Sequence, residues 1–319
     1  MFTLAELEAA ADLVHAHFPA TPAHRWPLLA ARAGCEVVVK HENHTPAGAF
    51  KVRGGVVFFD RLKRTAPDCP GVISATRGNH GQSLAYAGSR AGIPVTIVVP
   101  RGNSAEKNAA MRAFGAALVE HGADFDEARE HAAHLARRDG LLFAPSFHPD
   151  LVLGVATYAL ELFRAASDLD AVYVPIGLGS GICGLILARD LLGLSTRIVG
   201  VQSTEANAYA LSFAAGHVVT TNSANTRADG MATRVPDAGA LEIIRKGASH
   251  IVQVTDDQVR DAVRACWTDT HNLAEGAGAA ALAALLAEKD RMQGKRAGVI
   301  LSGGNIDLAL FQDWVLGTA

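Results

Sequence analysis

Short apolar runs alternate with longer helical segments along most of the chain, and this alternation restricts the folds that it can adopt. Several runs are almost continuously apolar, as expected for parallel strands that are buried on both faces. Such strands, joined by helices, form doubly wound α/β sheets through right-handed crossovers. We expect strands at 35–41, 71–76, 94–100, 116–121, 171–176, 197–203, 250–255 and 296–303, with helices between them such as 79–92, 104–114, 124–139, 182–193, 256–270 and 275–289.

The order of these units predicts two α/β domains. Three consecutive βα units lie between about residues 66 and 146, and they can form a small sheet of their own. We therefore expect a small domain over 66–146 and a large domain built from 1–65 and 147–319. No Ser/Pro-rich linker marks the boundary, so the division follows from the number of units.

Composition excludes several classes of protein. The formal net charge of −3 and the lack of a basic patch argue against nucleic-acid binding. No apolar run is long enough to span a membrane, and the first 18 residues form an amphipathic pattern rather than a signal peptide. The four scattered cysteines form no C-x-x-C pair, which argues against a disulfide framework or a zinc site. We expect a cytoplasmic α/β enzyme.

Ligands of doubly wound folds bind at the carboxyl ends of strands. After the strand at 35–41, the irregular segment 45–48 leads to Lys51, which opens a helical run. The positive end of a helix dipole is expected to lower the pKa of this amine, favouring the free form that makes Schiff bases. The same pattern also fits a solvated lysine beside a glycine loop.

Two further turns lie at helix N-termini, where free N–H groups bind anions. Residues 76–82 contain Asn79, whose amide can donate to a phenolate or carboxylate oxygen; an ordinary N-cap is the alternative. Residues 177–184 suit a phosphate. They also match the dinucleotide fingerprint as Gly179-x-Gly181-x-x-Gly184, with Glu205 about 20 residues further on. An NAD-dependent oxidoreductase is therefore the alternative from another class, although it leaves the lysine loop and the turn at 301–305 unexplained.

Together these motifs resemble the fold type II pyridoxal-phosphate enzymes, in the threonine/serine dehydratase and serine racemase branch. The matching segments span almost the whole chain in order: HENHTPAGAFKVRGG, SATRGNHGQSLAYAG, VPIGLGSGICG, GVQSTEANA, ADGMATR, EGAGAAALAAL and LSGGN. The resemblance implies a tryptophan synthase β-subunit-like fold, pyridoxal 5′-phosphate as cofactor, a mobile small domain that closes over an amino-acid substrate, and a homodimer.

The resemblance also implies roles for individual residues. Lys51 would carry the cofactor and later take the Cα proton, and Glu275 would start a helix near the active site. The other cofactor-binding residues would be Phe50 against the ring, Asn79 at the ring hydroxyl, Ser302 at the ring nitrogen, and Gly177, Leu178, Gly179, Ser180 and Gly181 at the phosphate. The substrate carboxylate would lie on Thr76, Gly78, Asn79 and His80.

The activity implied is that of a dehydratase, or ammonia-lyase, that converts a β-hydroxy amino acid of the threonine/serine type to a 2-oxo acid and ammonia by α,β-elimination. Dehydration of 3-hydroxyaspartate or phenylserine, and then serine racemisation, are the alternatives within the family. A serine hydroxyl such as that of Ser302 donates to a pyridine nitrogen without protonating it. The ring is then a weaker electron sink, which favours loss of a β leaving group.

Three departures from the family pattern matter. Arg77 replaces a serine that serves racemases as an acid/base, and an always-protonated guanidinium predicts little racemisation. Arg77 would contact a distal substrate group, such as a side-chain carboxylate, or else face solvent or a local acid. Leu178 and Ser180 interrupt a run of glycines, so we expect Leu178 to point away from the phosphate.

The third departure concerns a metal. Some relatives bind Mg²⁺ or Ca²⁺ near the segment that here contains Asp229, but Arg227 adds a positive charge beside it. We expect no bound metal, with the Arg227 guanidinium taking its place. Because the chain ends soon after the turn at 301–305, we also expect no C-terminal regulatory domain and no feedback inhibition through one.

Overall fold

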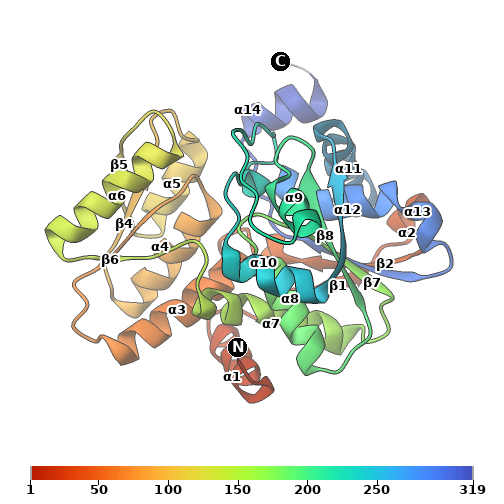
Figure 1. Cartoon of the computed structure of the whole chain (residues 1–319), viewed down its shortest axis with the longest axis horizontal. Helices are drawn as coiled ribbons and strands as arrows, with labels where there is room; N and C mark the ends of the chain where they lie inside the picture. The colour runs from red at the N-terminus through yellow and green to blue at the C-terminus, as the bar shows by residue number, and fades with distance from the viewer. Residues whose placement is uncertain (1, 318–319) are drawn as a thin grey trace.

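In the computed structural model, which describes residues 2–317, the chain forms two sheets (Figure 1). The strand order is β1-β2-β10-β7-β8-β9 in the larger sheet and β5-β4-β3-β6 in the smaller one. Neighbouring strands are parallel except β1 and β2, which confirms the predicted mostly parallel α/β class. The strands are β1 (Ala23–Arg25), β2 (Glu36–His41), β3 (Val72–Ala75), β4 (Val95–Val99), β5 (Ala117–Glu120), β6 (Leu142–Phe143), β7 (Ala171–Pro175), β8 (Arg197–Ser203), β9 (Ala248–Val254) and β10 (Arg296–Leu301).

Helices connect most of these strands and cover both sheets. They are α1 (Leu4–His15), α2 (Pro27–Ala33), α3 (Lys51–Thr65), α4 (Asn79–Ala91), α5 (Ala105–Ala113), α6 (Phe125–Asp139), α7 (Pro149–Ala165), α8 (Ser180–Leu191), α9 (Ala208–Ala215), α10 (Ala238–Gly247), α11 (Asp256–Thr270), α12 (Gly276–Ala287), α13 (Lys289–Met292) and α14 (Leu308–Leu310). Two 3-10 helices, η1 (Glu42–His44) and η2 (Asp229–Met231), and one π-helix, η3 (Phe311–Leu316), complete the helical elements of residues 2–317. No helix within 2–317 has the length and apolarity needed to cross a bilayer.

The small sheet is built only from residues 72–143, which lie within the small domain expected at 66–146. Its helix α6 packs on one face, with Ala128 and Ala132 against Ile73 and Val98. The domain bounds themselves stay a prediction, and residues 1, 318 and 319 of the expected large domain lie outside the described part of the chain.

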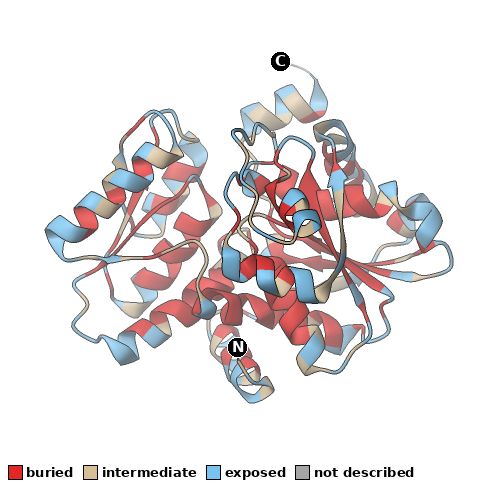
Figure 2. Cartoon of the chain, viewed as in Figure 1, coloured by how far each residue is buried: buried red, intermediate tan, exposed pale blue. Residues whose placement is uncertain are grey.

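The core explains how the two sheets are held together. One apolar cluster extends from α7 and α8 on the large sheet, through α3 and α4, to the inner face of the small sheet. A second cluster joins α2, α11 and α12 to the opposite face of the large sheet, and Figure 2 shows this burial along both sheets. Because α3 and α4 belong to the shared cluster, the N-termini of both helices are held beside the carboxyl ends of the large-sheet strands.

Candidate active site

One pocket brings together residues from segments that are far apart in the sequence. Its lining includes all nine residues predicted to bind the cofactor, namely Phe50, Lys51, Asn79, Gly177, Leu178, Gly179, Ser180, Gly181 and Ser302. Four residues that the sequence did not assign to the cofactor complete it, namely Pro175, Gly230, Glu275 and Ala277. The pocket lies where β7 and β10 end and where α3, α4, α8 and α12 begin, as doubly wound folds predict.

Lys51 is the first residue of α3, and its side chain is partly open to the pocket while its amine lies among densely packed atoms. Its Nζ atom is 4.9 Å from the centroid of the Phe50 ring. Burial lowers the pKa of this amine to about 8, although the Glu275 carboxyl raises it. The direction matches the sequence-based expectation, but burial rather than the helix dipole is the main cause.

Asn79 is held in one orientation by hydrogen bonds on both sides of its amide. Its Nδ2 donates to Glu275 Oε1 at 2.7 Å, and its Oδ1 accepts from Asn305 Nδ2 at 2.8 Å. Asn305 Nδ2 also donates to the Ala47 carbonyl at 2.8 Å. The second N–H of Asn79 therefore has no acceptor within residues 2–317 and can donate to a molecule in the pocket.

The loop from Gly177 to Gly181 leads into the N-terminus of α8. Within residues 2–317, none of its five backbone N–H groups donates to a protein acceptor. Gly179 has a φ of 101°, which suits glycine, and the Tyr209 hydroxyl donates to the Leu178 carbonyl at 2.9 Å. Free amides at a helix N-terminus fit a phosphate, the Lys51 amine fits an aldehyde, and the Ser302 hydroxyl is a ring-nitrogen donor. The residues present therefore fit pyridoxal phosphate.

The predicted substrate loop borders this pocket beside Asn79. The Gly78 N–H donates to Thr76 Oγ1 at 3.2 Å, which shapes the turn. Arg77 is exposed, and its side chain has no partner within the described residues. His80 is buried with Nε2 unpaired, and burial lowers its pKa to about 3, so the ring is neutral. The loop thus presents neutral polar groups toward the interior of the protein and one cation, Arg77, toward the solvent.

Lys107 of α5 is a buried cation that the sequence analysis missed. Its side chain covers Gly78, and its Nζ lies 2.6 Å from Asp229 Oδ2. Burial lowers the pKa of Lys107, but the nearby acids Asp229 and Glu275 raise it by more, so the amine stays protonated. Its ion pair with Asp229 joins segments more than 100 residues apart, and no local motif in the sequence indicates this pair.

Arg227 pairs with a local acid, as expected, but this acid is not Asp229. Arg227 Nη1 lies 3.7 Å from Asp313 Oδ2, whereas the cation on Asp229 is Lys107. Among residues 2–317, no group of three or more His, Cys, Asp or Glu side chains is arranged to hold a metal ion.

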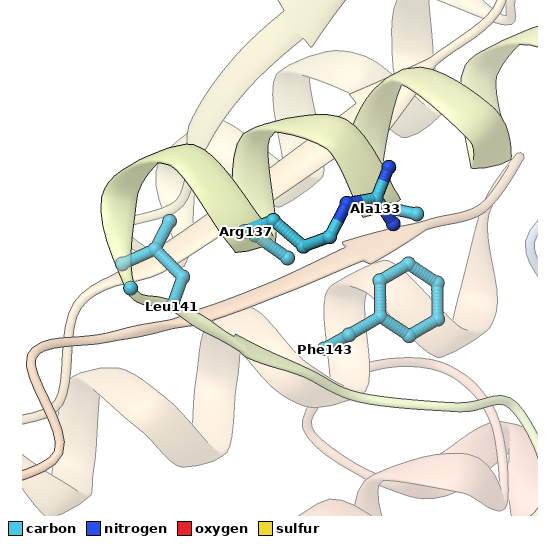
Figure 3. Close-up of a pocket in the computed structure, with 6 residues that line it drawn as sticks. Ala133, Arg137, Leu141 and Phe143 are labelled. Atoms are coloured by element: carbon cyan, nitrogen blue, oxygen red, sulfur yellow. The ribbon is translucent and has the colours of Figure 1, made fainter.

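A second hollow lies on the outer side of the small domain, between the end of α6 and β6 (Figure 3). The Arg137 side chain runs along it toward Ala133, and Leu141 and Phe143 form its other walls. None of the predicted site residues lines this hollow, so the first pocket is the candidate active site.

Comparison with known proteins agrees with this geometry. The family described as "Pyridoxal-phosphate dependent enzyme" matches residues 14–303. This chain belongs to that family. It is 33% identical over 282 residues to the L-threonine ammonia-lyase of Thermotoga maritima, covering 88% of this chain and 70% of that protein. It is 30% identical over 319 residues to the L-threo-3-hydroxyaspartate ammonia-lyase of Saccharomyces cerevisiae, covering 99% and 97%.

The solved structure of maize serine racemase is similar as well, with a TM-score of 0.91, 27% identity and coverage of 99% of this chain and 97% of that one. The predictions of a fold type II enzyme of the threonine/serine dehydratase branch and of pyridoxal phosphate as cofactor are confirmed. The NAD-dependent alternative is wrong, and the glycines of its fingerprint belong to a pyridoxal-phosphate enzyme instead.

Proposed function

We propose that this pyridoxal-phosphate enzyme is an ammonia-lyase that removes water and then ammonia from a small β-hydroxy amino acid of the threonine/serine type. The observation that carries the proposal is the pocket in which the Lys51 amine, the Asn79 amide and five free N–H groups converge. Two relatives that are named as ammonia-lyases match this chain over most of their length, and their names support the same reaction class.

Different residues would bind the cofactor and the substrate. The amides of residues 177–181 hold the cofactor phosphate, Asn79 donates to the ring hydroxyl and Ser302 donates to the ring nitrogen. When bound, pyridoxal phosphate withdraws electrons from the substrate Cα and so makes its proton removable. The loop from Thr76 to His80 binds the substrate carboxylate, which fixes the Cα–H bond toward Lys51.

The elimination then needs one base. Lys51 takes the proton from Cα, and the bond between Cβ and the hydroxyl oxygen breaks. The electrons of the Cα–H bond form a double bond between Cα and Cβ. The oxygen leaves with the electron pair of its bond to Cβ and takes up the proton that Lys51 removed, so that water is released. The enamine product leaves the pocket and hydrolyses to a 2-oxo acid and ammonia. The pKa of about 8 for Lys51 suits an amine that must be neutral in order to accept this proton.

Arg77 supports elimination over racemisation. Its side chain is exposed and always protonated, so it offers no base on the face of Cα opposite to Lys51. A second candidate substrate is 3-hydroxyaspartate, which has a carboxylate on its side chain. Arg77 and the Lys107 ammonium both lie at the loop from Thr76 to His80, where they could bind this second carboxylate. Phenylserine has no such observation in its favour.

We also propose that the small domain closes over the substrate and that the enzyme is a cytoplasmic homodimer. Four free cysteines suit a reducing compartment. Exposed apolar side chains on the α2 and α11 side, including Leu28 and Trp267, suit a contact between two copies.

The proposed function is tested by measuring 2-oxo acid release from threonine, serine, 3-hydroxyaspartate and phenylserine. We expect turnover of at least one of them, a visible cofactor band, and loss of both in Lys51→Ala. Arg77→Ala should change the ranking of 3-hydroxyaspartate against threonine if Arg77 binds the second carboxylate. Full turnover by Lys51→Ala would contradict the proposal.

A further inference from the structure

Glu275 occupies an unusual position for an acidic residue at the start of a helix. It is the N-cap of α12, yet its side chain makes no hydrogen bond to the N–H groups of that helix. The shorter carboxylate of Asp ordinarily accepts such bonds when it is the N-cap. Here the side chain turns away from α12 and into the pocket beside Asn79.

The two carboxyl oxygens of Glu275 have different surroundings. Oε1 accepts from Asn79 Nδ2 at 2.7 Å, whereas Oε2 is buried and has no partner within residues 2–317. The residue is only 3% exposed, so water cannot replace the missing partner freely. An unpaired buried carboxylate oxygen is costly, and a proton on the carboxyl or a molecule in the pocket removes that cost.

The surrounding chain makes room for this carboxyl. A Cβ atom at Gly303 would lie 2.4 Å from Glu275 Oε1, so a larger residue at the end of the last strand would displace it. Charged groups face Glu275 from three other elements: Lys51 from α3, Lys107 from α5 and Asp229 from η2. The pKa of Glu275 is raised to about 7, because burial and, to a lesser extent, Asp229 raise it by more than the two lysines and Asn79 lower it.

We propose that Glu275 is a positioning residue that carries an exchangeable proton and, through the Asn79 amide, sets the protonation of the hydroxyl edge of the bound cofactor. This proposal rests on the proposed function, because it requires the cofactor on Lys51. A charged Glu275 near Lys51 favours a proton on the lysine nitrogen. A neutral Glu275 removes that charge, and the same proton moves to the ring hydroxyl.

The test is the visible absorption of the holoenzyme without substrate, since the two protonation forms absorb at different wavelengths. In the unmodified enzyme, we expect the ratio of the two bands to change with pH as Glu275 gains and loses its proton. Glu275→Gln keeps the size of the side chain and an oxygen for Asn79, but it cannot titrate, so the ratio should stay constant. Glu275→Asp keeps a carboxyl at a changed distance and should restore the titration with a shifted midpoint.

Glu205→Gln is the matched control, because Glu205 is an exposed acid after β8 that does not line the pocket. Its titration should follow the unmodified enzyme. A pH-independent ratio in the unmodified enzyme, or an unchanged midpoint in Glu275→Gln, overturns the proposal. If Glu275→Gln fails to fold, an unchanged midpoint in Glu275→Asp overturns it equally. The absence of any cofactor band in the unmodified enzyme contradicts the proposed function instead.

Discussion

At the scale of single residues, the site is marked by polar atoms that the protein leaves without partners. Buried polar side-chain atoms are nearly always hydrogen-bonded, yet His80 Nε2 and Glu275 Oε2, which both belong to groups near Lys51, have no partner within residues 2–317. The free second N–H of Asn79 belongs to the same group. A site with this many unused donors and acceptors is organised to bind a polar molecule before it arrives.

The rate at which pyridoxal phosphate binds to the Lys51 amine should depend on pH below about 8, whereas that of an ordinary lysine depends on pH up to about 10.5. An ordinary lysine has a pKa of 10.5, but burial lowers that of Lys51 to about 8. Because the neutral amine attacks the aldehyde, the rate of loading onto the apoprotein should rise about tenfold per pH unit below pH 8 and level off above it. Stopped-flow absorbance would measure this rate. A rise that continues to about pH 10 would show that Lys51 behaves as a solvated lysine.

At the scale of elements, apolar runs in the sequence predicted all eight of the longer strands to within two residues of their ends, although β5 and most of β9 are not buried. β1 and β6 were not predicted, because three and two residues are too short to show a period. The resemblance to the family named all nine pocket residues, and each of them lies next to a strand end or a helix start. The resemblance placed Glu275 near the active site and matched the segment of Asn305. The partners of Glu275, Lys107 and Asn305, however, lie 122 to 226 residues away, and local sequence does not indicate which residues these are.

The start of α3 is held by a buried ionic network two residues beyond Lys51. Arg53 is fully buried; its Nε donates to Glu42 Oε2 at 2.7 Å and its Nη1 to Glu161 Oε1 at 2.6 Å. Lys40 also reaches Glu161, at 2.5 Å. These bonds join α3, η1, α7 and β2, so they fix the helix that begins with Lys51.

Arg53→Met should therefore destabilise the protein strongly. It leaves the Glu42 and Glu161 carboxyls without their shared guanidinium, and breaking a buried ion pair in this way costs about 3–5 kcal/mol. Urea unfolding would measure the loss. Arg64→Met, which removes the exposed pair with Asp60, is the control and should change the free energy of unfolding by less than about 1 kcal/mol. Equal losses in both variants would show that the network does not stabilise α3.

The same network predicts how stability depends on acid. Burial alone would raise the pKa of Glu161, but Arg53 and Lys40 lower it from 4.5 to about 2. Between these values the unfolded chain binds more protons than the native one, so the stabilisation is complete above about pH 4.5 and is lost as the pH falls toward 2. As the pH is lowered across this range, the midpoint temperature of thermal unfolding should fall more steeply for the unmodified protein than for Glu161→Gln. Parallel curves would mean that Glu161 titrates alike in both states.

At the scale of the whole molecule, the helices of the small sheet meet the large-sheet elements through one apolar contact and several polar ones, which include the bonds of Asn79 to Glu275 and Asn305 and the pair of Arg234 with Asp126. On one side α3 packs against α4 within the shared core. On the other, polar contacts join the start of α5 to the large sheet's loops. Ser104 Oγ donates to Asp307 Oδ1 at 2.7 Å, the Leu308 N–H donates to Glu106 Oε1 at 3.0 Å, and Lys107 pairs with Asp229. An apolar joint opposite a set of polar contacts is the arrangement expected of a hinge and a latch.

If the small domain closes as proposed, weakening this latch should weaken substrate binding without altering the pocket. In the double variant Glu106→Ala, Asp307→Ala, two hydrogen bonds across the interface are lost, worth about 1–2 kcal/mol together. Closure would then cost more, so KM should rise roughly 5- to 30-fold while the cofactor band and the unfolding temperature change little. Lys246→Ala, which removes an exposed ion pair within α10, should leave KM unchanged. An unchanged KM in the double variant would mean that the two sheets stay together without these bonds. A fall in kcat at constant KM would mean that the same bonds act on the chemical step, through Lys107 and the loop that it covers.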